Sequence, residues 1–124
     1  MTVLLDSWTW IEYFKGSEKG RHAEKYMKGG EQIIISTINV AEVFRYTLST
    51  LSLREAEAAV NYMLNAAFVI PVNVEIAIEA AKIKHEKKWG LGDSIILATA
   101  RQNTAVVVTG DEDFRNEKNV VFLG

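Results

Sequence analysis

The chain of 124 residues contains no cysteine, only two histidines and a single proline. Without cysteine the protein has no disulfide bond and no thiolate metal site, and two histidines leave little basis for a zinc site. If a metal binds here, its ligands must be oxygen atoms. That restriction favours a hard cation such as Mg²⁺ or Mn²⁺.

Long apolar runs and a large excess of one charge are also missing. The longest apolar runs, such as Val3–Leu5 and Ala105–Val108, are far shorter than a membrane span. No secretory signal is visible at the N-terminus, so we expect a cytoplasmic protein without membrane association. The formal net charge of −2 gives no strongly basic footprint for nucleic acid. Nucleic acid remains a candidate substrate, because a bound divalent ion reverses the local field.

What the sequence does contain is an alternation of short apolar strands and helices. The length predicts one domain, residues 1–124, with one core. Strands that are β-branched, apolar on both faces and separated by helices indicate an α/β fold with a parallel sheet covered on both sides. We expect strands at Val3–Leu5, Ile33–Ile35, Phe68–Ile70, Ala105–Val108 and Val120–Leu123, and helices at 8–14, Arg21–Lys28, Ile38–Leu48, 53–66, Val74–Lys88 and Ser94–Gln102.

Acidic residues stand at the junctions between these elements. Asp6 follows the first strand, Asp93 opens the last long helix, and Asp111 and Asp113 follow the fourth strand. Glu42 lies one turn into the helix after the second strand. Because right-handed connections place the strand-end loops at one edge of a parallel sheet, we expect these carboxylates to converge. Converging carboxylates repel unless they are protonated or bridged by a cation. At neutral pH a divalent ion is the natural solution, and phosphodiester hydrolysis is the chemistry that needs such a site.

Each acidic residue also has an ordinary structural explanation. Asp93 could cap its helix, and Asp6 could interact with the N-terminus of the helix that follows it. Asp111 could serve a turn, and Glu42 could pair with Arg45 three residues further on. Taken one at a time these explanations are the stronger ones. Taken together, the common edge favours a site.

Four stretches follow one another in a characteristic order: Asp6-Ser7, Asn39–Val43, Leu91–Ala100 and Thr109–Phe114. Together they resemble the PIN-domain ribonucleases, and among these the sequence is most similar to the VapC toxins of prokaryotic toxin–antitoxin pairs. The similarity extends over essentially the whole chain. The stretches Leu91–Ala100 and Thr109–Phe114 are the more specific for this family, whereas Asp6 alone would be a weak signal.

The resemblance implies a set of site residues. The metal-binding acids would be Asp6, Glu42, Asp93 and Asp111, which would also be catalytic, with Asp113 as an additional acid. We expect Asp111 rather than Asp113 to be the direct ligand, because it follows the strand immediately. Thr109 would support the site by hydrogen bonding, with Ser7 beside Asp6.

The resemblance also implies a three-layer sandwich with a five-stranded parallel sheet of order 3-2-1-4-5, a homodimer and a VapB-like antitoxin that blocks the site. The leading hypothesis is therefore a Mg²⁺-dependent endoribonuclease, with Mn²⁺ as a second candidate cofactor. RNA contacts could come from basic side chains near the acids, although a solvated helix face explains the lysines equally well. These candidates are Arg45, Lys84, Lys87, Lys88 and Arg101.

Aromatic residues are concentrated in the first half of the chain. A domain of this size is not expected to bury all of them, so some could form a groove for a partner helix or a dimer contact. The set consists of Trp8, Trp10, Tyr13, Phe14, Phe44 and Tyr46.

Two alternatives remain open. The first is a PIN domain without a toxin role, acting in RNA processing or only binding RNA or a partner. The second is a signalling receiver domain, which usually has paired acids after its first strand and a lysine after its last. Here Ser7 follows Asp6, and 120–124 contains no lysine. Nucleophilic catalysis has no support, since His85 has no apparent serine partner.

Overall fold

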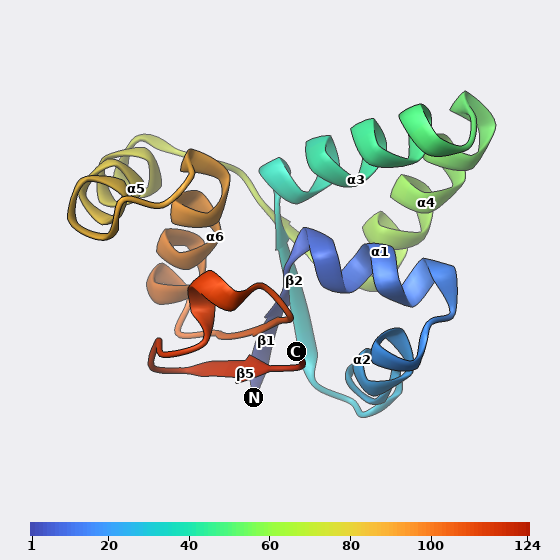
Figure 1. Ribbon diagram of the computed structural model, residues 1–124, viewed down its shortest axis with the longest axis horizontal. Helices are drawn as coiled ribbons and strands as arrows, with labels where there is room; N and C mark the ends of the chain where they lie inside the picture. Colours follow the sequence, from blue (N-terminus) through green and yellow to red (C-terminus); the bar gives the residue numbers. More distant parts are fainter.

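The computed structural model, which describes residues 1–124, contains a five-stranded sheet between two layers of helices (Figure 1). All four pairs of neighbouring strands are parallel, and their order is β3-β2-β1-β4-β5. This is the order that the sequence resemblance implied. The strands are β1 (Thr2–Leu5), β2 (Gln32–Ser36), β3 (Phe68–Ile70), β4 (Val106–Thr109) and β5 (Val120–Phe122).

Six α-helices and one short 3₁₀ helix connect the strands. None of them combines the length and the apolarity that crossing a membrane would require. The helices are α1 (Ser7–Lys15), α2 (Glu18–Lys28), α3 (Thr37–Thr50), α4 (Leu53–Ala66), α5 (Val74–Lys87), α6 (Leu91–Gln102) and the 3₁₀ helix η1 (Glu112–Phe114).

The two core layers follow from the alternation of side chains along each strand. Leu4 of β1 points to the layer that α5 and α6 cover, where it joins a cluster with Ile96 and Phe114. Its neighbours Val3 and Leu5 point to the opposite layer, which is covered by α1 to α4. The central strand β1 is therefore buried on both faces, as its apolar sequence predicts.

The edge strand β3 departs from that expectation. Phe68 is 64% exposed and Val69 is 37% exposed, although both are apolar. The reason is position rather than composition, because β3 pairs with β2 on one side and has no strand on the other. A sequence of three apolar residues does not distinguish an edge strand from a central one.

Several helix starts differ from those predicted from the sequence. Helix α6 begins at Leu91 and is preceded by Gly90 as its N-cap, so the prediction that Asp93 opens the helix was wrong. Glycines suggested a turn there, but both Leu91 and Gly92 adopt helical geometry. Asp93 is instead the third residue of α6. Its carboxylate makes no capping bond and is available to face another element.

Helices α1 and α2 also begin differently. Asp6, not Ser7, caps α1. Helix α2 starts at Glu18 rather than Arg21, because the side chain of Ser17 accepts a hydrogen bond from the backbone N–H of Gly20. In the first turn of α2, Glu18 and Lys19 are exposed, whereas Gly20 is buried against the end of α1. Strand β4 begins one residue later than predicted and includes Thr109 as its last residue.

Candidate metal centre

The site begins where β1 and β4 end side by side. Leu5 is in register with Val108, and the backbone N–H of Asp6 donates to the carbonyl oxygen of Val108. The next residues, Asp6 and Thr109, therefore meet at the carboxyl edge of the sheet, where the Thr109 hydroxyl donates to Oδ2 of Asp6. A contact between residues 103 positions apart is thus fixed by strand register.

Asp6 is held rigidly in a buried position. Its Oδ1 accepts hydrogen bonds from the backbone N–H of Thr9 at 2.9 Å and from the Thr9 hydroxyl at 2.7 Å. Only 5% of Asp6 is exposed. Burial raises the pKa of this carboxyl group to about 6, against the opposing effect of the hydrogen bonds from Thr109 and Thr9.

Thr109 connects Asp6 to the loop that follows β4. Its hydroxyl oxygen accepts a hydrogen bond from the backbone N–H of Asp111 at 2.9 Å. Asp111 in turn caps η1, because its Oδ1 accepts from the backbone N–H of Asp113 at 2.9 Å. The Thr109 hydroxyl thus links Asp6 to the backbone of Asp111, whose carboxylate caps the short helix that carries Asp113.

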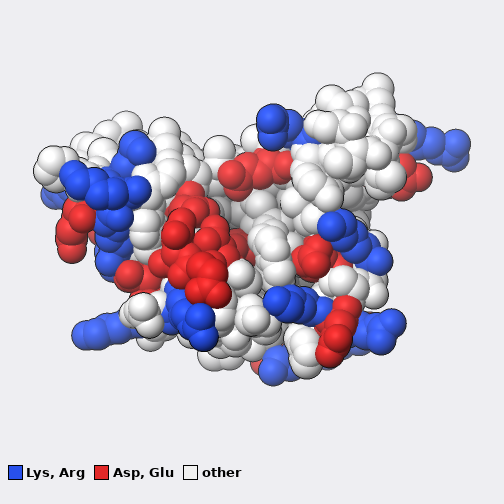
Figure 2. Space-filling model, in the orientation of Figure 1, with Lys and Arg blue, Asp and Glu red and all other residues white.

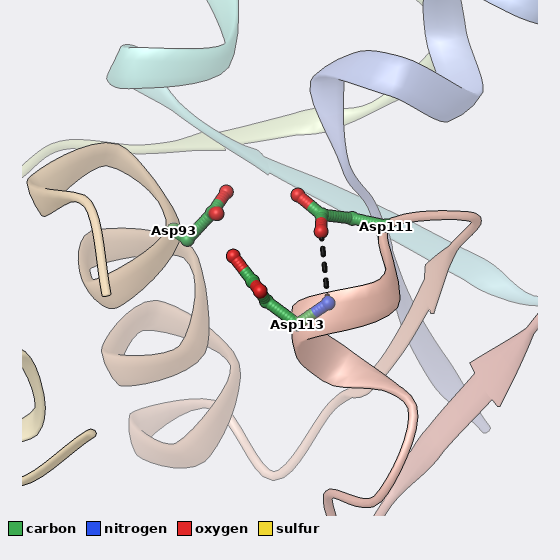
Figure 3. A group of neighbouring side chains, drawn as sticks. All are labelled: Asp93, Asp111 and Asp113. Atoms are coloured by element: carbon green, nitrogen blue, oxygen red, sulfur yellow. Dashed lines mark hydrogen bonds between the residues drawn. The ribbon is translucent and has the colours of Figure 1, made fainter. Parts of the chain in front are cut away.

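Acidic side chains gather in the middle of the face shown in Figure 2. Asp93 from α6, Asp111 from the loop after β4 and Asp113 from η1 each offer an oxygen, and these oxygens all lie within 4.8 Å of one another (Figure 3). None of the three carboxylates takes part in an ion pair. Their negative charges therefore have no positive side-chain partner within the protein.

The pKa of Asp93 is raised both by burial and by the neighbouring carboxylates. Burial is the largest cause of its rise to about 7, and the charges of Asp111, Glu42 and Asp113 add to it. Three hard oxygen donors with uncompensated charge suit a divalent cation such as Mg²⁺ or Mn²⁺, which would relieve the repulsion. The residues present thus fit a hard metal ion.

Glu42 reaches the same edge from α3 and is oriented by a directed chain of hydrogen bonds. The backbone N–H of Ser36 donates to Oδ1 of Asn39, so the amide nitrogen of Asn39 faces Ser7 and donates to its hydroxyl at 2.9 Å. Ser7 Oγ accepts that bond and therefore gives its only proton to Oε1 of Glu42, at 2.6 Å. A Cβ at Gly92 would lie 2.8 Å from Oε2 of Glu42, so Glu42 packs against the first turn of α6.

Of the four ordinary structural explanations given for the acidic residues, two hold in the structure and two do not. Asp6 and Asp111 do cap a helix and a turn, as those explanations required. Asp93 caps nothing, and Glu42 bonds to Ser7 rather than to Arg45. Although Asp6 and Asp111 cap helices, both still lie at the same edge of the sheet as the other acidic residues.

Asp6 and Glu42 lie outside the group of three oxygens within 4.8 Å. They border it nonetheless, because the charge of Asp111 acts on Asp6 and that of Glu42 acts on Asp93. The five acids predicted from the sequence are therefore neighbours at one edge rather than a single cluster.

Asn39 is the member of this hydrogen-bond chain that the sequence analysis did not propose as a site residue. It is fully buried, and with Ser36 it forms a capping box at the start of α3. The spacing Ser-x-x-Asn was visible in the sequence, but a capping box usually has Glu or Gln at the second position. A buried asparagine in that position therefore gave a weaker signal.

Of the five basic side chains proposed to contact RNA, three bind other groups of the protein and two do not. Lys84 donates to the backbone oxygen of Trp89, Lys87 pairs with Glu117, and Arg101 lies near Glu79 and Glu117. Lys88 ends α5 and forms no ion pair, and Arg45 forms none either. Of the five, Arg45 is the one on the same helix as Glu42.

The fold and the site define an α/β protein with an acidic centre at the carboxyl edge of a parallel sheet. A receiver domain is excluded, because a receiver sheet has the strand order 2-1-3-4-5, whereas the sheet of this protein has the order 3-2-1-4-5. The sequence profile of the PIN domain family matches residues 3–118, and the chain belongs to that family. The family suggested by the sequence motifs is thereby confirmed.

Solved structures resemble the chain over nearly its whole length. A toxin–antitoxin complex from Klebsiella pneumoniae has a chain that is 26% identical, with a TM-score of 0.80 and 98% of both chains covered. DNA-bound VapBC from Salmonella typhimurium gives 20% identity and a TM-score of 0.79, covering 100% of this chain and 99% of that one.

A more distant similarity involves VapC20 of Mycobacterium tuberculosis, a toxin described as cleaving the sarcin–ricin loop. It is 16% identical, with a TM-score of 0.69 over 83% of this chain and 84% of that one. At that identity the similarity supports the fold alone. No curated protein sequence matches the chain.

The hydrogen-bond chain to Glu42 generates a stability prediction. In Ser7→Ala, the buried amide of Asn39 loses its acceptor and Glu42 loses its donor. We expect the free energy of unfolding to fall by about 1–3 kcal/mol. Urea denaturation measures it, with Ser49→Ala as the control, since Ser49 bonds only to an exposed backbone oxygen of the same helix. Equal effects of the two substitutions would contradict the prediction.

The raised pKa values generate a second prediction. Asp6 and Asp93 hold protons in the folded state at pH values where the unfolded chain, with pKa values near 3.8, has released them. Stability in EDTA should therefore fall as the pH rises from about 5 to 7.5. Asp93→Asn should flatten this decline, whereas the exposed Glu57→Gln should not. Urea denaturation across this interval measures both, and parallel curves for wild type and Asp93→Asn would refute the prediction.

Proposed function

We propose that this protein is a Mg²⁺-dependent endoribonuclease that hydrolyses RNA phosphodiester bonds and is the toxin of a VapBC-type toxin–antitoxin pair. The observation that supports it most directly is the group of three carboxylate oxygens within 4.8 Å, with Asp6 and Glu42 at the same edge. Membership of the PIN family supports nuclease chemistry at such an edge.

In this proposal Asp93 and Asp111 hold the cation, with Asp113, Asp6 and Glu42 completing the acidic surroundings. Mg²⁺, or Mn²⁺ in its place, supplies Lewis-acid polarisation of the phosphoryl oxygen and charge compensation for the leaving oxygen. Asp111 is favoured over Asp113 as a direct ligand because η1 capping fixes its orientation, while Asp113 is exposed.

The protein's own residues supply orientation and proton transfer. Thr9 and Thr109 fix both oxygens of Asp6, and Ser7 fixes Glu42, so little reorganisation is needed when substrate binds. Asp93, with a pKa near 7 in the metal-free protein, can take up a proton at a carboxylate oxygen near neutral pH. A cation lowers that pKa, so metal binding and deprotonation of Asp93 are linked.

The toxin role draws on the similar structures. The Klebsiella pneumoniae and Salmonella typhimurium proteins are parts of toxin–antitoxin complexes, and the Mycobacterium tuberculosis toxin is described as cleaving an RNA loop. We infer the same roles for this chain, with a VapB-like antitoxin as partner in the cytoplasm.

Two surfaces suit the inferred partners. A groove of about 340 Å³ between α1, α3 and α4 is lined mainly by apolar and aromatic side chains, including Phe14, Leu51 and Tyr62. Its composition suits an amphipathic helix of an antitoxin. On α5, Val74 and Ile78 are 74% and 54% exposed and lie four residues apart, which suits the contact of a homodimer.

Metal-dependent cleavage is the direct test of the nuclease proposal. Wild-type protein should cleave single-stranded RNA in Mg²⁺ or Mn²⁺, EDTA should stop cleavage, and added metal should restore it. Asp93→Asn and Asp6→Asn should reduce the rate by at least about 100-fold, because losing even an indirect partner of a metal site costs 10–100-fold. Mn²⁺ should raise the melting temperature of the wild type but not of Asp93→Asn.

The matched control is Glu57→Gln, an exposed acid on α4 that should cleave and bind metal as wild type does. Circular dichroism verifies that each variant is folded. Cleavage that persists in EDTA, or an Asp93→Asn protein with the wild-type rate, would refute the proposal.

The toxin role has its own test. Induced expression of the wild type in a bacterial host should arrest growth, and Asp93→Asn should not, because arrest requires RNA cleavage. Co-expression of a small DNA-binding protein encoded directly upstream should restore growth. Normal growth with wild-type protein that is active in vitro would assign the chain to PIN nucleases without a toxin role.

A further inference from the structure

A hollow of about 550 Å³ lies between α1 and α3 and borders the acidic centre. Figure 2 shows that this face of the molecule is hollowed next to the gathered acidic side chains. We call this hollow the α1–α3 subsite. The side chains that matter for its chemistry are Ser7, Trp8, Lys15, Glu42, Arg45 and Tyr46.

One face of α3 leads from the acidic centre into the subsite. Glu42, Arg45 and Tyr46 are spaced by three and four residues, so they lie on the same side of the helix. Glu42 is oriented toward the centre by Ser7. Arg45 and Tyr46 follow one helical turn further on, about 5–6 Å away between Cβ atoms.

Arg45 presents a free positive charge in this subsite. The guanidinium is exposed and forms no ion pair, and Glu42, its expected partner, is bonded to Ser7 instead. Lys15 is less available, because its ammonium group lies 3.4 Å from the carboxylate of Glu12. An arginine with five unused donors matches the geometry of a phosphate group.

Aromatic rings form the other part of the subsite. Tyr46 and Trp8 are both half-buried and line the hollow from α3 and α1. Trp8 also packs against the loop before Asp111, since a Cβ at Gly110 would lie 2.3 Å from its ring. Half-buried rings next to a free cation are the features with which proteins bind unpaired bases and their phosphates.

We propose that the α1–α3 subsite binds the nucleotide adjacent to the scissile phosphate of single-stranded RNA, with Arg45 on its phosphate and Tyr46 stacked on its base. The assignment rests on the proposed nuclease function and adds the two residues, Arg45 and Tyr46, that hold the substrate beside the acidic centre. A base within a duplex is already stacked and paired, so a base of duplex RNA cannot stack on the Tyr46 ring.

A peptide segment of a protein partner is the competing occupant. The observations favour a nucleotide, because the subsite opens onto Glu42 and holds an unpaired arginine beside Tyr46, whose ring already faces one cation, the Lys15 ammonium at 5.7 Å from the ring centroid. The apolar groove further along α3, lined by Phe14, Leu51 and Tyr62, has the composition expected for a helix instead. Tyr46 lies at the border between the two and lines both.

Binding of a labelled oligonucleotide tests the proposal. The probe is a fluorescein-labelled single-stranded RNA of about 12 nucleotides, compared with its duplex, in Mg²⁺ and in an Asp93→Asn background that prevents cleavage. Fluorescence anisotropy gives Kd at KCl concentrations from about 50 to 200 mM. The variants are Arg45→Gln and Arg45→Lys, Tyr46→Leu and Tyr46→Phe, with Arg54→Gln on α4 as the matched control.

Arg45→Gln should weaken binding of the single strand about tenfold and reduce the slope of log K against log salt by about 0.7, the contribution of one phosphate contact. Arg45→Lys should keep most of that slope. Tyr46→Leu should weaken binding by about 5- to 100-fold, and Tyr46→Phe, which keeps the ring, should bind as the parent protein does. Arg54→Gln should change nothing, because Arg54 is exposed and lies outside the subsite.

Cleavage kinetics separate this proposal from the nuclease proposal. In the active protein, Arg45→Gln and Tyr46→Leu should raise KM more than they lower kcat. If the wild type cleaves RNA while both variants bind and cleave like it, the subsite assignment is wrong and the nuclease assignment stands. If duplex and single strand respond equally to Tyr46→Leu, base stacking is refuted. If the wild type cleaves no RNA but binding follows the expected pattern, the nuclease proposal fails, and the subsite stands only as a binding site for single-stranded RNA.

Discussion

Electrostatic repulsion between carboxylates is the constraint around which this protein is built. Oxygens of Asp93, Asp111 and Asp113 lie within 4.8 Å of one another without a positive side chain to compensate them. Burial is the largest cause of the raised pKa values of Asp93 and Asp6, and the charges of neighbouring carboxylates raise both further. A metal-free protein tolerates the arrangement because the rest of the fold holds the groups in place, and a cation would turn the repulsion into attraction.

The sheet order explains why these groups meet where they do. From β1 the chain proceeds outward through β2 to β3, whereas β4 and β5 extend the sheet in the other direction. The boundary between β1 and β4 is therefore a topological switch point, where the following loops diverge and leave a crevice. Asp6 and Asp111 stand on either side of it, joined through the hydroxyl of Thr109. Helix α6 then brings Asp93 to the crevice, and α3 brings Glu42.

In the function that we propose, chemistry and selectivity are located in different parts of this edge. The acids form a centre that would treat any phosphodiester alike, because carboxylates and a metal ion recognise charge and not bases. Features that distinguish one nucleic acid from another must lie beside them, and Arg45 and Tyr46 on α3 are placed there. The same helix also supplies Glu42, so substrate binding and the acidic centre share one rigid element. The capping box of Ser36 and Asn39 anchors the start of that helix and orients Glu42 through Ser7.

The sequence by itself determined the alternation of strands and helices and the identity of the acids at or near the element ends. These are local properties, because periodicity, capping and strand ends are encoded within a few neighbouring residues. Only the tertiary structure decided that Asp93 lies inside its helix, that β3 is an exposed edge, and that Glu42 is oriented by Ser7 and Asn39 rather than paired with Arg45. Those outcomes depend on packing between segments far apart in the chain, where many partners compete and no short pattern records which one is chosen.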